Sequence, residues 1–386
     1  MESGIEKIYL ICQYNRKESG RNVIAPPAGI TWIDYLVRSL KAIGNNVSII
    51  SYSAGVGSSY FSHKIVEVDE KECVQFLPAL NCIGSCLLLR ISQLFSFVQV
   101  FFFILRKTNK NDKIILYHNY GFSRFMQFAR KIIKRNYIFI LGEFFAAVYD
   151  KGSECLKKEI DSVEGAKGYI IANSMMRQYV KTAVNYCVSH GDYTYCDIKR
   201  LLKEDNEPIQ VVYAGKISKT DITDAFIAAE IARYVQGDFL FHLLGYGTEN
   251  DINELKSLID NINKERGKRI ILFDGCLSGA EYDQFLSKCD IGLCTRTLKE
   301  PSCNLCFPSK TLVYLTHGLS VICPDAEFIR NSEITSLVTF VEGEMTPQNI
   351  ARTMDMMTLK KCDFKDAIHQ LDVKFLNSLK EMINAI

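Results

Sequence analysis

Residues 289–324 read as a short strand, an irregular loop, a helix and a second strand. The strands are the apolar runs at 290–294 and 320–323. The helix opens at Pro308 and stops at Gly318, a residue that suits the left-handed end of a helix. Two strands joined by a helix in one short stretch make a βαβ unit, whose strands run parallel. This stretch therefore predicts an α/β fold built on a parallel sheet.

The start of this helix predicts an anion site. Pro308 stands where a missing N–H costs nothing, Ser309 can cap the helix, and Lys310 adds an ammonium group. The free N–H groups of the first turn and the positive end of the helix dipole favour a negative ligand, most simply a phosphate or diphosphate. The alternative interpretation is a capped surface helix with an incidental lysine.

Residues 307–322, FPSKTLVYLTHGLSVI, resemble the donor-binding segment of the group 1, or family 4, glycosyltransferases, in particular bacterial polysaccharide members with an FPSK motif. The resemblance implies the GT-B fold, in which two Rossmann-like domains with parallel sheets face a central cleft. The sequence departs from the family where a pair of glutamates is usual, because Leu305 and Val313 stand at or near those positions. The matching residues are Phe307, Pro308, Ser309, Lys310, Tyr314, Leu315, Gly318, Val321 and Ile322.

The chain is long enough for two globular domains, since 386 residues with 48% hydrophobic content can fill two cores. Alternating strands and helices predict an N-terminal Rossmann-like domain at 1–185, which the resemblance makes the acceptor side. Periodicity is lost at 186–209, where we place a linker, and it returns in a nucleotide-sugar-binding domain at 210–360. The last helix, in 361–386, has one apolar face and is expected to return to the N-terminal domain, as in GT-B folds.

The resemblance assigns the donor mainly to the second domain. The glycine loop after the strand IQVVYAG would bring Lys216 and Lys219 to the diphosphate beside Lys310, and converging cations suit a leaving group on which charge develops. In the first domain, Gly29 precedes a helix expected at 31–43 whose start approaches the donor in the family, although it is otherwise a plain turn residue. The expected donor-binding residues are Gly29, Lys219, Gly245, Gly247, Gly275, Cys276, Leu277, Pro308, Ser309 and Thr311.

Two residues of the first domain are expected to join Lys216 and Lys310 in catalysis. His118 ends the segment KIILYH, which resembles the family strand whose histidine lies over the donor sugar. Glu143 emerges at the carboxyl end of the strand YIFILGE, where open α/β sheets place their ligands. A structural histidine and a solvated loop carboxylate are the alternative interpretations.

A strongly apolar stretch at 76–106 is followed by three lysines. It is long enough to span a bilayer, but Arg90 interrupts it, and the strand at 113–118 should lie in the same domain. We therefore expect a helix that is partly core and partly available for an interface. Its basic end suits an anionic cytoplasmic membrane surface, so peripheral contact is predicted through 83–107, with a plain core helix and a true span as alternatives.

Charge and cysteine content narrow the function classes. The net charge of +2, with mixed signs, argues against nucleic acid as a partner. The fourteen cysteines are scattered singly, often inside apolar strands, which is typical of buried free thiols in a reducing cytosol. Cys303 and Cys306 form a CxxC without a second pair, and the chain has no Asp-x-Asp, so no metal or other cofactor is expected. The charged start, followed directly by a strand, predicts no signal peptide.

Taken with the resemblance, these observations predict a glycosyltransferase that moves a sugar from a nucleotide diphosphate sugar, by default a UDP-sugar, onto a lipid-linked or growing glycan. The family implies retention of configuration, independence of metals, and a role in bacterial capsule or O-antigen synthesis, at the inner face of the plasma membrane. Two other classes stay open. The missing glutamate pair would suit a non-catalytic GT-B binding or assembly protein, and a GT-B sugar-nucleotide epimerase would bind the same donor without an acceptor.

Overall fold

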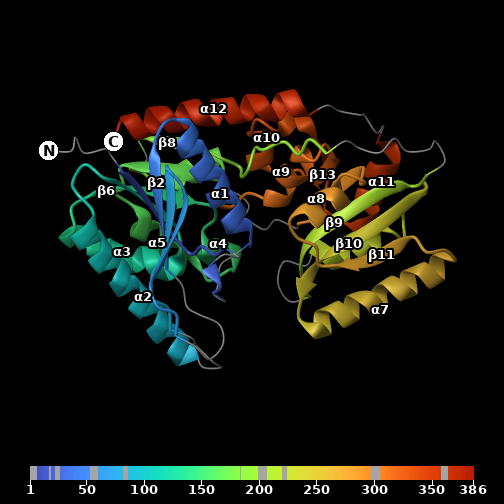
Figure 1. Ribbon diagram of the computed structural model, residues 1–386. Coiled ribbons are helices and arrows are strands. Elements are labelled where there is room, and N and C mark those ends of the chain that lie inside the picture. Colours follow the sequence, from blue (N-terminus) through green and yellow to red (C-terminus); the bar gives the residue numbers. More distant parts are fainter. Residues whose placement is uncertain are drawn as a thin grey trace. The chain divides into compact units, whose positions relative to one another are not determined.

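The chain divides into two compact units, each built on its own sheet (Figure 1). Unit 1 comprises Met1–Asp192, Asn304–Phe307 and Val373–Ile386, and unit 2 comprises Tyr193–Cys303 and Pro308–Asp372. The computed structural model describes residues 7–16, 19–21, 27–52, 60–80, 86–182, 184–198, 207–219, 224–296, 305–357 and 364–386.

Unit 1 holds an eight-stranded sheet with the strand order β3-β4-β2-β1-β5-β6-β7-β8. Neighbouring strands are parallel except β3 and β4, which form an antiparallel hairpin at one edge. The central strands are apolar runs buried on both faces, as parallel strands covered by helices require. The strands are β1 (Lys7–Cys12), β2 (Asn46–Ser51), β3 (Lys64–Asp69), β4 (Glu72–Phe76), β5 (Lys113–Tyr117), β6 (Asn136–Leu141), β7 (Gly168–Ile171) and β8 (Tyr186–Val188).

Helices cover both faces of this sheet, and Figure 1 shows the C-terminal part of α12 on one side of the strands with α2 and α3 on the other. Ring contacts fix these layers: Tyr35 of α1 lies 5.5 Å from Phe375 of α12, and Tyr9 of β1 lies 5.7 Å from Phe103 of α2. The helices are α1 (Pro27–Ala42), α2 (Cys86–Lys107), α3 (Tyr120–Ile132), α4 (Phe145–Val148), α5 (Ser153–Val163), the 3-10 helix η2 (Ser174–Tyr179) and α12 (Lys365–Asn384).

The first helix begins earlier than the sequence predicts. It was expected at 31–43 but starts at Pro27, because proline fits the first helical position, where no N–H is needed. Gly29 therefore lies inside the first turn of α1, where it is buried, and does not precede the helix.

The linker expected at 186–209 is placed too early. Tyr186–Val188 form β8, which pairs in parallel with β7 and buries Cys187 in unit 1. A strand of only three residues is too short to show the alternation by which strands are recognised in a sequence. Unit 2 begins at Tyr193, and residues 199–206 lie outside the described part of the chain.

Unit 2 holds a six-stranded sheet, β11-β10-β9-β12-β13-β14, in which every pair is parallel. The βαβ prediction for 289–324 is confirmed, since β12 and β13 pair in parallel and Gly318 ends α9 with a φ of +72°. The strands are β9 (Ile209–Ile217), β10 (Phe239–Gly247), β11 (Ile271–Gly275), β12 (Ile291–Leu293), β13 (Ser320–Pro324) and β14 (Val338–Val341). The helices are α6 (Asp224–Ile231), α7 (Glu249–Arg266), α8 (Ala280–Leu286), α9 (Ser309–Thr316), α10 (Glu327–Arg330), η4 (Thr335–Leu337) and α11 (Pro347–Met356).

The C-terminal segment, Val373–Ile386, belongs to unit 1. Phe375 is buried against α1, and the Lys113 ammonium at the start of β5 donates a hydrogen bond to the Ile383 carbonyl (2.6 Å). The last helix thus packs on the first domain, where the sequence analysis expected it to return.

A second distant segment, Asn304–Phe307, also belongs to unit 1. The sequence analysis included it in the second domain at 210–360, and that boundary is wrong for these residues. Leu305, Cys306 and Phe307 are all buried, and the surfaces that bury them belong to unit 1. Contacts so distant in sequence leave no local pattern by which they could be predicted.

Candidate functional site

Lys310 lies at the carboxyl edge of the unit 2 sheet, where open α/β sheets bind ligands. α9 begins at Ser309, so Lys310 is in its first turn. The Lys310 ammonium donates a hydrogen bond to the Tyr213 hydroxyl (2.8 Å) and lies 4.1 Å from the centre of that ring. It also faces Asp224, the first residue of α6, whose Oδ2 is 3.4 Å away. With 25% of its side chain exposed, Lys310 remains reachable from solvent.

The charges in this group influence one another. Burial by itself would lower the pKa of Lys310, but Tyr213 and Asp224 outweigh it and raise that pKa, so the ammonium is protonated at neutral pH. Burial raises the pKa of Asp224, and the nearby cations Lys310 and Arg296 oppose that rise. Asp224 is buried, and among the described residues its Oδ1 accepts no hydrogen bond. The sequence analysis missed Asp224, because an acidic residue at a helix start is common and signals no function.

The start of α9 differs from the expectation in one respect. Pro308 is the N-cap residue and no side chain caps the helix, so Ser309 is the first helical residue rather than the cap. Ser309 is exposed, whereas Thr311 is buried and its N–H donates to the Pro308 carbonyl (2.9 Å). A first turn without a side-chain cap leaves N–H groups for another acceptor.

Two glycines of the unit 2 sheet make room for side chains of α9. A Cβ on Gly215 would collide with Cε and Nζ of Lys310, and a Cβ on Gly292 would collide with the Tyr314 ring. Tyr314 is buried, and its hydroxyl accepts a hydrogen bond from the Ala214 N–H (2.9 Å). β9 therefore contacts α9 through both Lys310 and Tyr314, which accounts for both residues of the 307–322 segment.

Gly245 and Gly247, which the sequence analysis assigned to the donor, lie opposite Gly215 and Ile217 where β10 pairs with β9. A Cβ on Gly245 would collide with the Gly215 carbonyl, and one on Gly247 with the Ile217 carbonyl. The close approach of the two strands thus explains both glycines without a ligand. Their role in donor binding stays a prediction.

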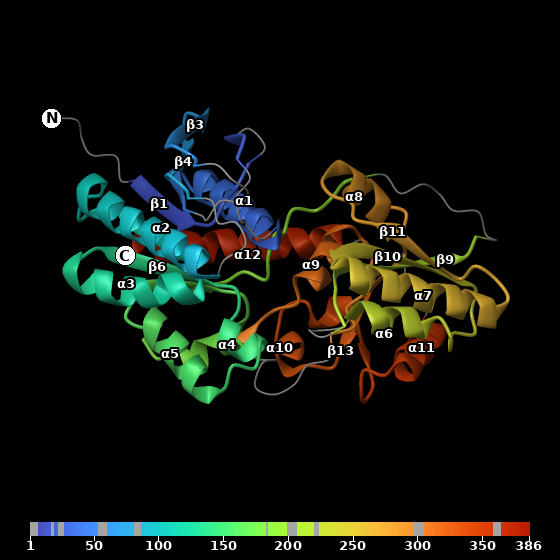
Figure 2. The same ribbon diagram turned by 90° about the horizontal axis from the view of Figure 1, so that it is seen from below.

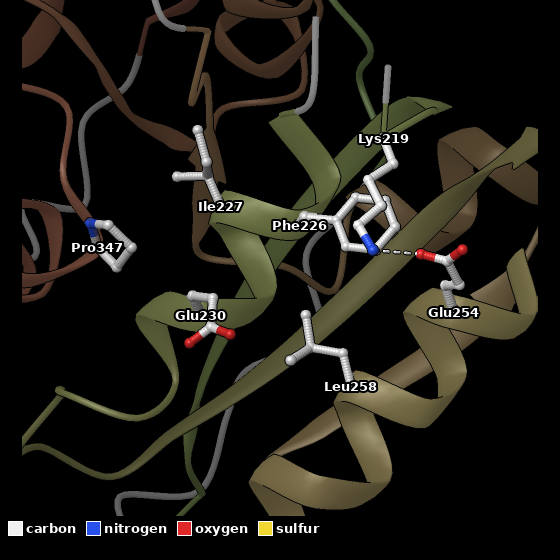
Figure 3. Close-up of a pocket in the computed structure, with 7 residues that line it drawn as sticks. All are labelled: Lys219, Phe226, Ile227, Glu230, Glu254, Leu258 and Pro347. Carbon is white, nitrogen blue, oxygen red and sulfur yellow. Dashed lines mark hydrogen bonds and ion pairs between the residues drawn. The ribbon is translucent and has the colours of Figure 1, made fainter. Parts of the chain in front are cut away.

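Lys219 faces α7. Its ammonium pairs with Glu254 (2.5 Å), and its N–H donates to Asp251 (3.1 Å). Figure 3 shows the pair beside a pocket of about 340 Å³ at α6 and α7. The other residues that line this pocket are Phe226, Ile227, Glu230, Leu258 and Pro347.

The expected convergence of three lysines is therefore not met for Lys219, since carboxylates of α7 attract it. Lys216 and Lys310 do share a neighbour. The Tyr213 hydroxyl accepts from the Lys310 ammonium and donates to the Lys216 carbonyl (3.1 Å), while the Lys216 side chain is exposed at the end of β9. β9 thus brings these two of the expected catalytic groups to one place.

The segment expected to bind the nucleotide base follows β11. Gly275 has a φ of +80°, which favours glycine, Cys276 is exposed and Leu277 is half-buried. His242 of β10 holds the preceding Asp274, with Nδ1 2.9 Å from the carboxylate. The three residues thus form a loop at the carboxyl edge of β11, and contact with a base stays a prediction.

His118, expected to lie over the donor sugar, is buried in a hydrogen-bond network of unit 1. Its Nδ1 lies 2.7 Å from the Ser123 hydroxyl and its Nε2 lies 2.7 Å from Glu159. Glu159 is also buried, and its carboxylate accepts hydrogen bonds from the N–H groups of Phe145 (2.9 Å) and Ala146 (2.7 Å) at the start of α4. In this conformation the imidazole supports α4 and offers neither ring nitrogen to a ligand.

Glu143 follows β6, as the sequence predicts, and is half-buried. Its backbone forms an antiparallel bridge with Cys306, a contact that sequence reasoning missed. Burial, and next the Glu143 carboxylate, raise the pKa of the neighbouring Tyr117 hydroxyl. Glu159 was also missed, since nothing in the sequence of α5 sets that glutamate apart.

Metal and disulfide chemistry have few candidates in this chain. Among the described residues, no three His, Cys, Asp or Glu side chains gather into a metal site. The cysteines whose side chains the structure describes are free thiols. Cys303 of the CxxC lies outside the described residues, so independence of metals stays a prediction.

No protein-family model and no curated protein sequence matches the chain, but solved structures do. Trehalose-6-phosphate synthase from Burkholderia multivorans is 8% identical with a TM-score of 0.66, and the match covers 99% of this chain and 96% of that one. HepE from Anabaena, solved with UDP and glucose, is 13% identical with a TM-score of 0.65, covering 99% and 100%. Sucrose-phosphate synthase from Thermosynechococcus elongatus is 12% identical with a TM-score of 0.62, covering 98% and 94%. The shared feature is the fold, and the GT-B prediction of two Rossmann-like domains is confirmed.

Proposed function

We propose that this protein is a glycosyltransferase that binds its donor, a nucleotide diphosphate sugar, at the start of α9 in unit 2. The observation that carries the proposal is Lys310, a protonated ammonium in the first turn of a helix, passing over Gly215 at the carboxyl edge of a parallel sheet. The fold supports the proposal, since HepE, which shares it, was solved with UDP and glucose.

The arrangement suits the departure of a diphosphate. A lysine ammonium has three N–H donors; Tyr213 and Asp224 face two of them, and the third is left for a phosphate oxygen. Negative charge builds on the diphosphate as the bond to the sugar breaks, and a fixed ammonium at a helix N-terminus stabilises that charge. Lys216, at the end of the same strand as Tyr213, would add a second positive charge.

The resemblance of residues 307–322 to family 4 supports the finer parts of the proposal. The donor is a UDP-sugar, and the acceptor is a lipid-linked or growing glycan. Transfer proceeds with retention of configuration and without a metal. The product belongs to bacterial capsule or O-antigen synthesis.

Thermal stabilisation by nucleotides tests the donor site. We expect one of UDP, GDP, CMP and dTDP to raise the melting temperature without Mg²⁺, by about 2.7 kcal/mol of stability when its concentration is a hundredfold above its Kd. Lys310→Met with Asp224→Asn removes the ammonium without leaving a buried charge unpaired and should abolish the effect. Lys264→Ala, an exposed lysine of α7, is the matched control. Failure of every nucleotide to stabilise the unaltered protein would overturn the proposal.

We further propose that the protein works in the cytoplasm, at the inner face of the plasma membrane, and contacts it with α2 and α3. Leu87–Lys107 is the stretch, among the described helices, that is long and apolar enough to cross a membrane, yet only 28% of its apolar window is buried. One side of α2 is fixed on unit 1, with Phe97 lying 5.9 Å from Tyr52. A helix held in this way can lie along a bilayer but cannot cross it.

The outward side of these helices carries large apolar residues, which we name the α2–α3 surface. Figures 1 and 2 show α2 and α3 side by side, and Phe97 of α2 lies 5.7 Å from Phe125 of α3. Exposed basic residues accompany the surface, among them Arg106, Lys107 and Lys131. Apolar side chains with a basic border suit an anionic bilayer. The members of the α2–α3 surface are Leu87, Ile91, Leu94, Val98, Phe102, Leu105, Phe128 and Ile132.

One observation favours a second candidate function, a GT-B protein that binds the donor without transferring it. Both ring nitrogens of His118 are engaged inside unit 1, and Val313 stands where the family usually has a glutamate. Incubation with the stabilising nucleotide's sugar donor separates the two. A transferase commonly releases free sugar slowly from its donor, whereas a binding protein releases none.

A further inference from the structure

Residues 305–307, which we name the strap, run along unit 1 directly before α9. The Phe144 N–H donates to the Leu305 carbonyl (3.0 Å), and the Cys306 backbone bridges to Glu143. The Phe307 ring stacks on His190, with 4.3 Å between ring centres and 19° between ring planes. All three strap residues are more than nine-tenths buried. Hydrogen bonds and a ring stack therefore fix this short segment.

The groups that hold the strap come from one edge of the unit 1 sheet. Glu143 and Phe144 follow β6, Asn173 follows β7 and His190 follows β8. The Asn173 amide donates a hydrogen bond to the Cys306 carbonyl (2.7 Å). The strap thus occupies the carboxyl ends of three neighbouring strands, the place where open α/β sheets otherwise take a ligand.

The strap leads directly into the candidate donor site. Phe307 is followed by Pro308, the N-cap residue of α9, and Lys310 stands in the first turn of that helix. A backbone fixed up to Phe307 leaves α9 little freedom in where it starts, and the direction of its first turn sets where the ammonium of Lys310 points.

We propose that the strap positions Lys310 for the donor diphosphate and that Asn173 is a positioning residue that acts through it. This inference rests on the proposed function. It also assigns a use to the phenylalanine of the FPSK segment, which anchors the chain in unit 1 while the lysine serves unit 2. Donor binding at α9 is thereby linked to the sheet edge of unit 1 through a single covalent crossing.

Asn173→Asp tests the inference with little change in shape. Oδ1 of Asn173 accepts the Met175 N–H (2.9 Å) at the start of η2, and a carboxylate keeps that cap. The other oxygen then faces the Cys306 carbonyl with no hydrogen to donate. We expect the Kd of the stabilising nucleotide to rise about tenfold at pH 8, with faster amide exchange at 305–309. Part of the lost affinity should return at acidic pH, relative to the unaltered protein, because a protonated carboxyl donates again.

Asn119→Asp is the matched control, since Asn119 caps α3 by the same contact and does not touch the strap. It should leave both the Kd and the exchange at 305–309 unchanged. Faster exchange in Asn173→Asp with an unaltered Kd would overturn the positioning role, and so would a Kd that changes equally in both variants. If no nucleotide stabilises even the unaltered protein, the proposed function fails and the positioning role fails with it, while the exchange rates still show whether Asn173 anchors the strap.

Discussion

Single residues acquire their chemistry here from neighbours that are distant in sequence. Lys310 meets Tyr213 across 97 positions and Asp224 across 86. Gly215 is equally specific, because a side chain there would occupy the space of the Lys310 ammonium. The FPSK segment identifies the lysine, but its protonation and direction depend on β9 and α6.

Removing the ammonium should expose the cost of the buried carboxylate. Lys310→Met leaves Asp224 unpaired, and we expect the free energy of unfolding to fall by about 3 kcal/mol near neutral pH. The loss should shrink as the pH falls from about 8 to about 5, because the unpaired carboxyl, whose pKa is already raised by burial, takes up a proton. Urea unfolding across this pH range measures both effects.

The double variant Lys310→Met with Asp224→Asn provides the comparison for that measurement. It lacks both charges and should show little of the pH dependence. In the unaltered protein the raised pKa of Lys310 means that its contribution is present below about pH 10 and is lost as the pH rises through its folded pKa. Unfolding of Lys310→Met that matches the unaltered protein at every pH would contradict the assignment of the pair.

Among the elements, α2 is apolar over more of its surface than its packing on unit 1 uses. Phe97, Val100 and Ile104 face inward and are buried, whereas Leu94 and Leu105 face outward and are about half exposed. Burying an exposed leucine or phenylalanine stabilises by about 1.5 to 3 kcal/mol, so the α2–α3 surface can drive an association. Its basic border favours an anionic lipid surface over a neutral one.

Vesicle sedimentation tests the α2–α3 surface. The unaltered protein should bind phosphatidylcholine vesicles that contain phosphatidylglycerol, bind pure phosphatidylcholine less, and lose affinity at high salt. Leu94→Glu should weaken binding about tenfold or more, because it places a charge in the apolar contact. Met356→Glu alters an exposed apolar residue of α11 in unit 2 and should bind as the unaltered protein does. A concentration-dependent dimer that Leu94→Glu abolishes, without vesicle binding, would assign the surface to a second copy instead.

At the scale of the whole molecule, the chain passes more than once between the two units. Val373–Ile386 completes unit 1, although 180 residues of unit 2 and of the strap lie between it and Asp192. The C-terminal segment buries Phe375, Leu379, Met382 and Ile383 in unit 1. Unit 1 therefore depends on the last residues of the chain for part of its core.

Leu379→Ala should destabilise unit 1 selectively. Leu379 is fully buried, and truncation to alanine typically costs about 2 to 5 kcal/mol. Trp32, the single tryptophan of the chain, lies in unit 1 with its indole N–H donating to Ser189 (2.9 Å), so its fluorescence reports that unit alone. The denaturant midpoint of this fluorescence should fall in Leu379→Ala and stay within about 0.5 kcal/mol in Val373→Ala, an exposed position of the same helix. A fluorescence midpoint that Leu379→Ala leaves unchanged would contradict this dependence.

The sequence determined the regular parts of this protein. The apolar strands, the helix ends at residues such as Gly318 and the βαβ order follow from local periodicity and turn chemistry, which act over a few residues. The same local reasoning, with the FPSK resemblance, singled out Lys310 and the fold of two Rossmann-like domains. Irregular and short pieces escaped it, as β8 and the early start of α1 show.

Tertiary structure alone decided what each chemical group meets. It placed Asp224 against Lys310, turned Lys219 toward α7 and closed His118 between Ser123 and Glu159. It also buried the strap in unit 1. These outcomes depend on packing and electrostatics between segments brought together only by the sheets, and no local pattern encodes such contacts.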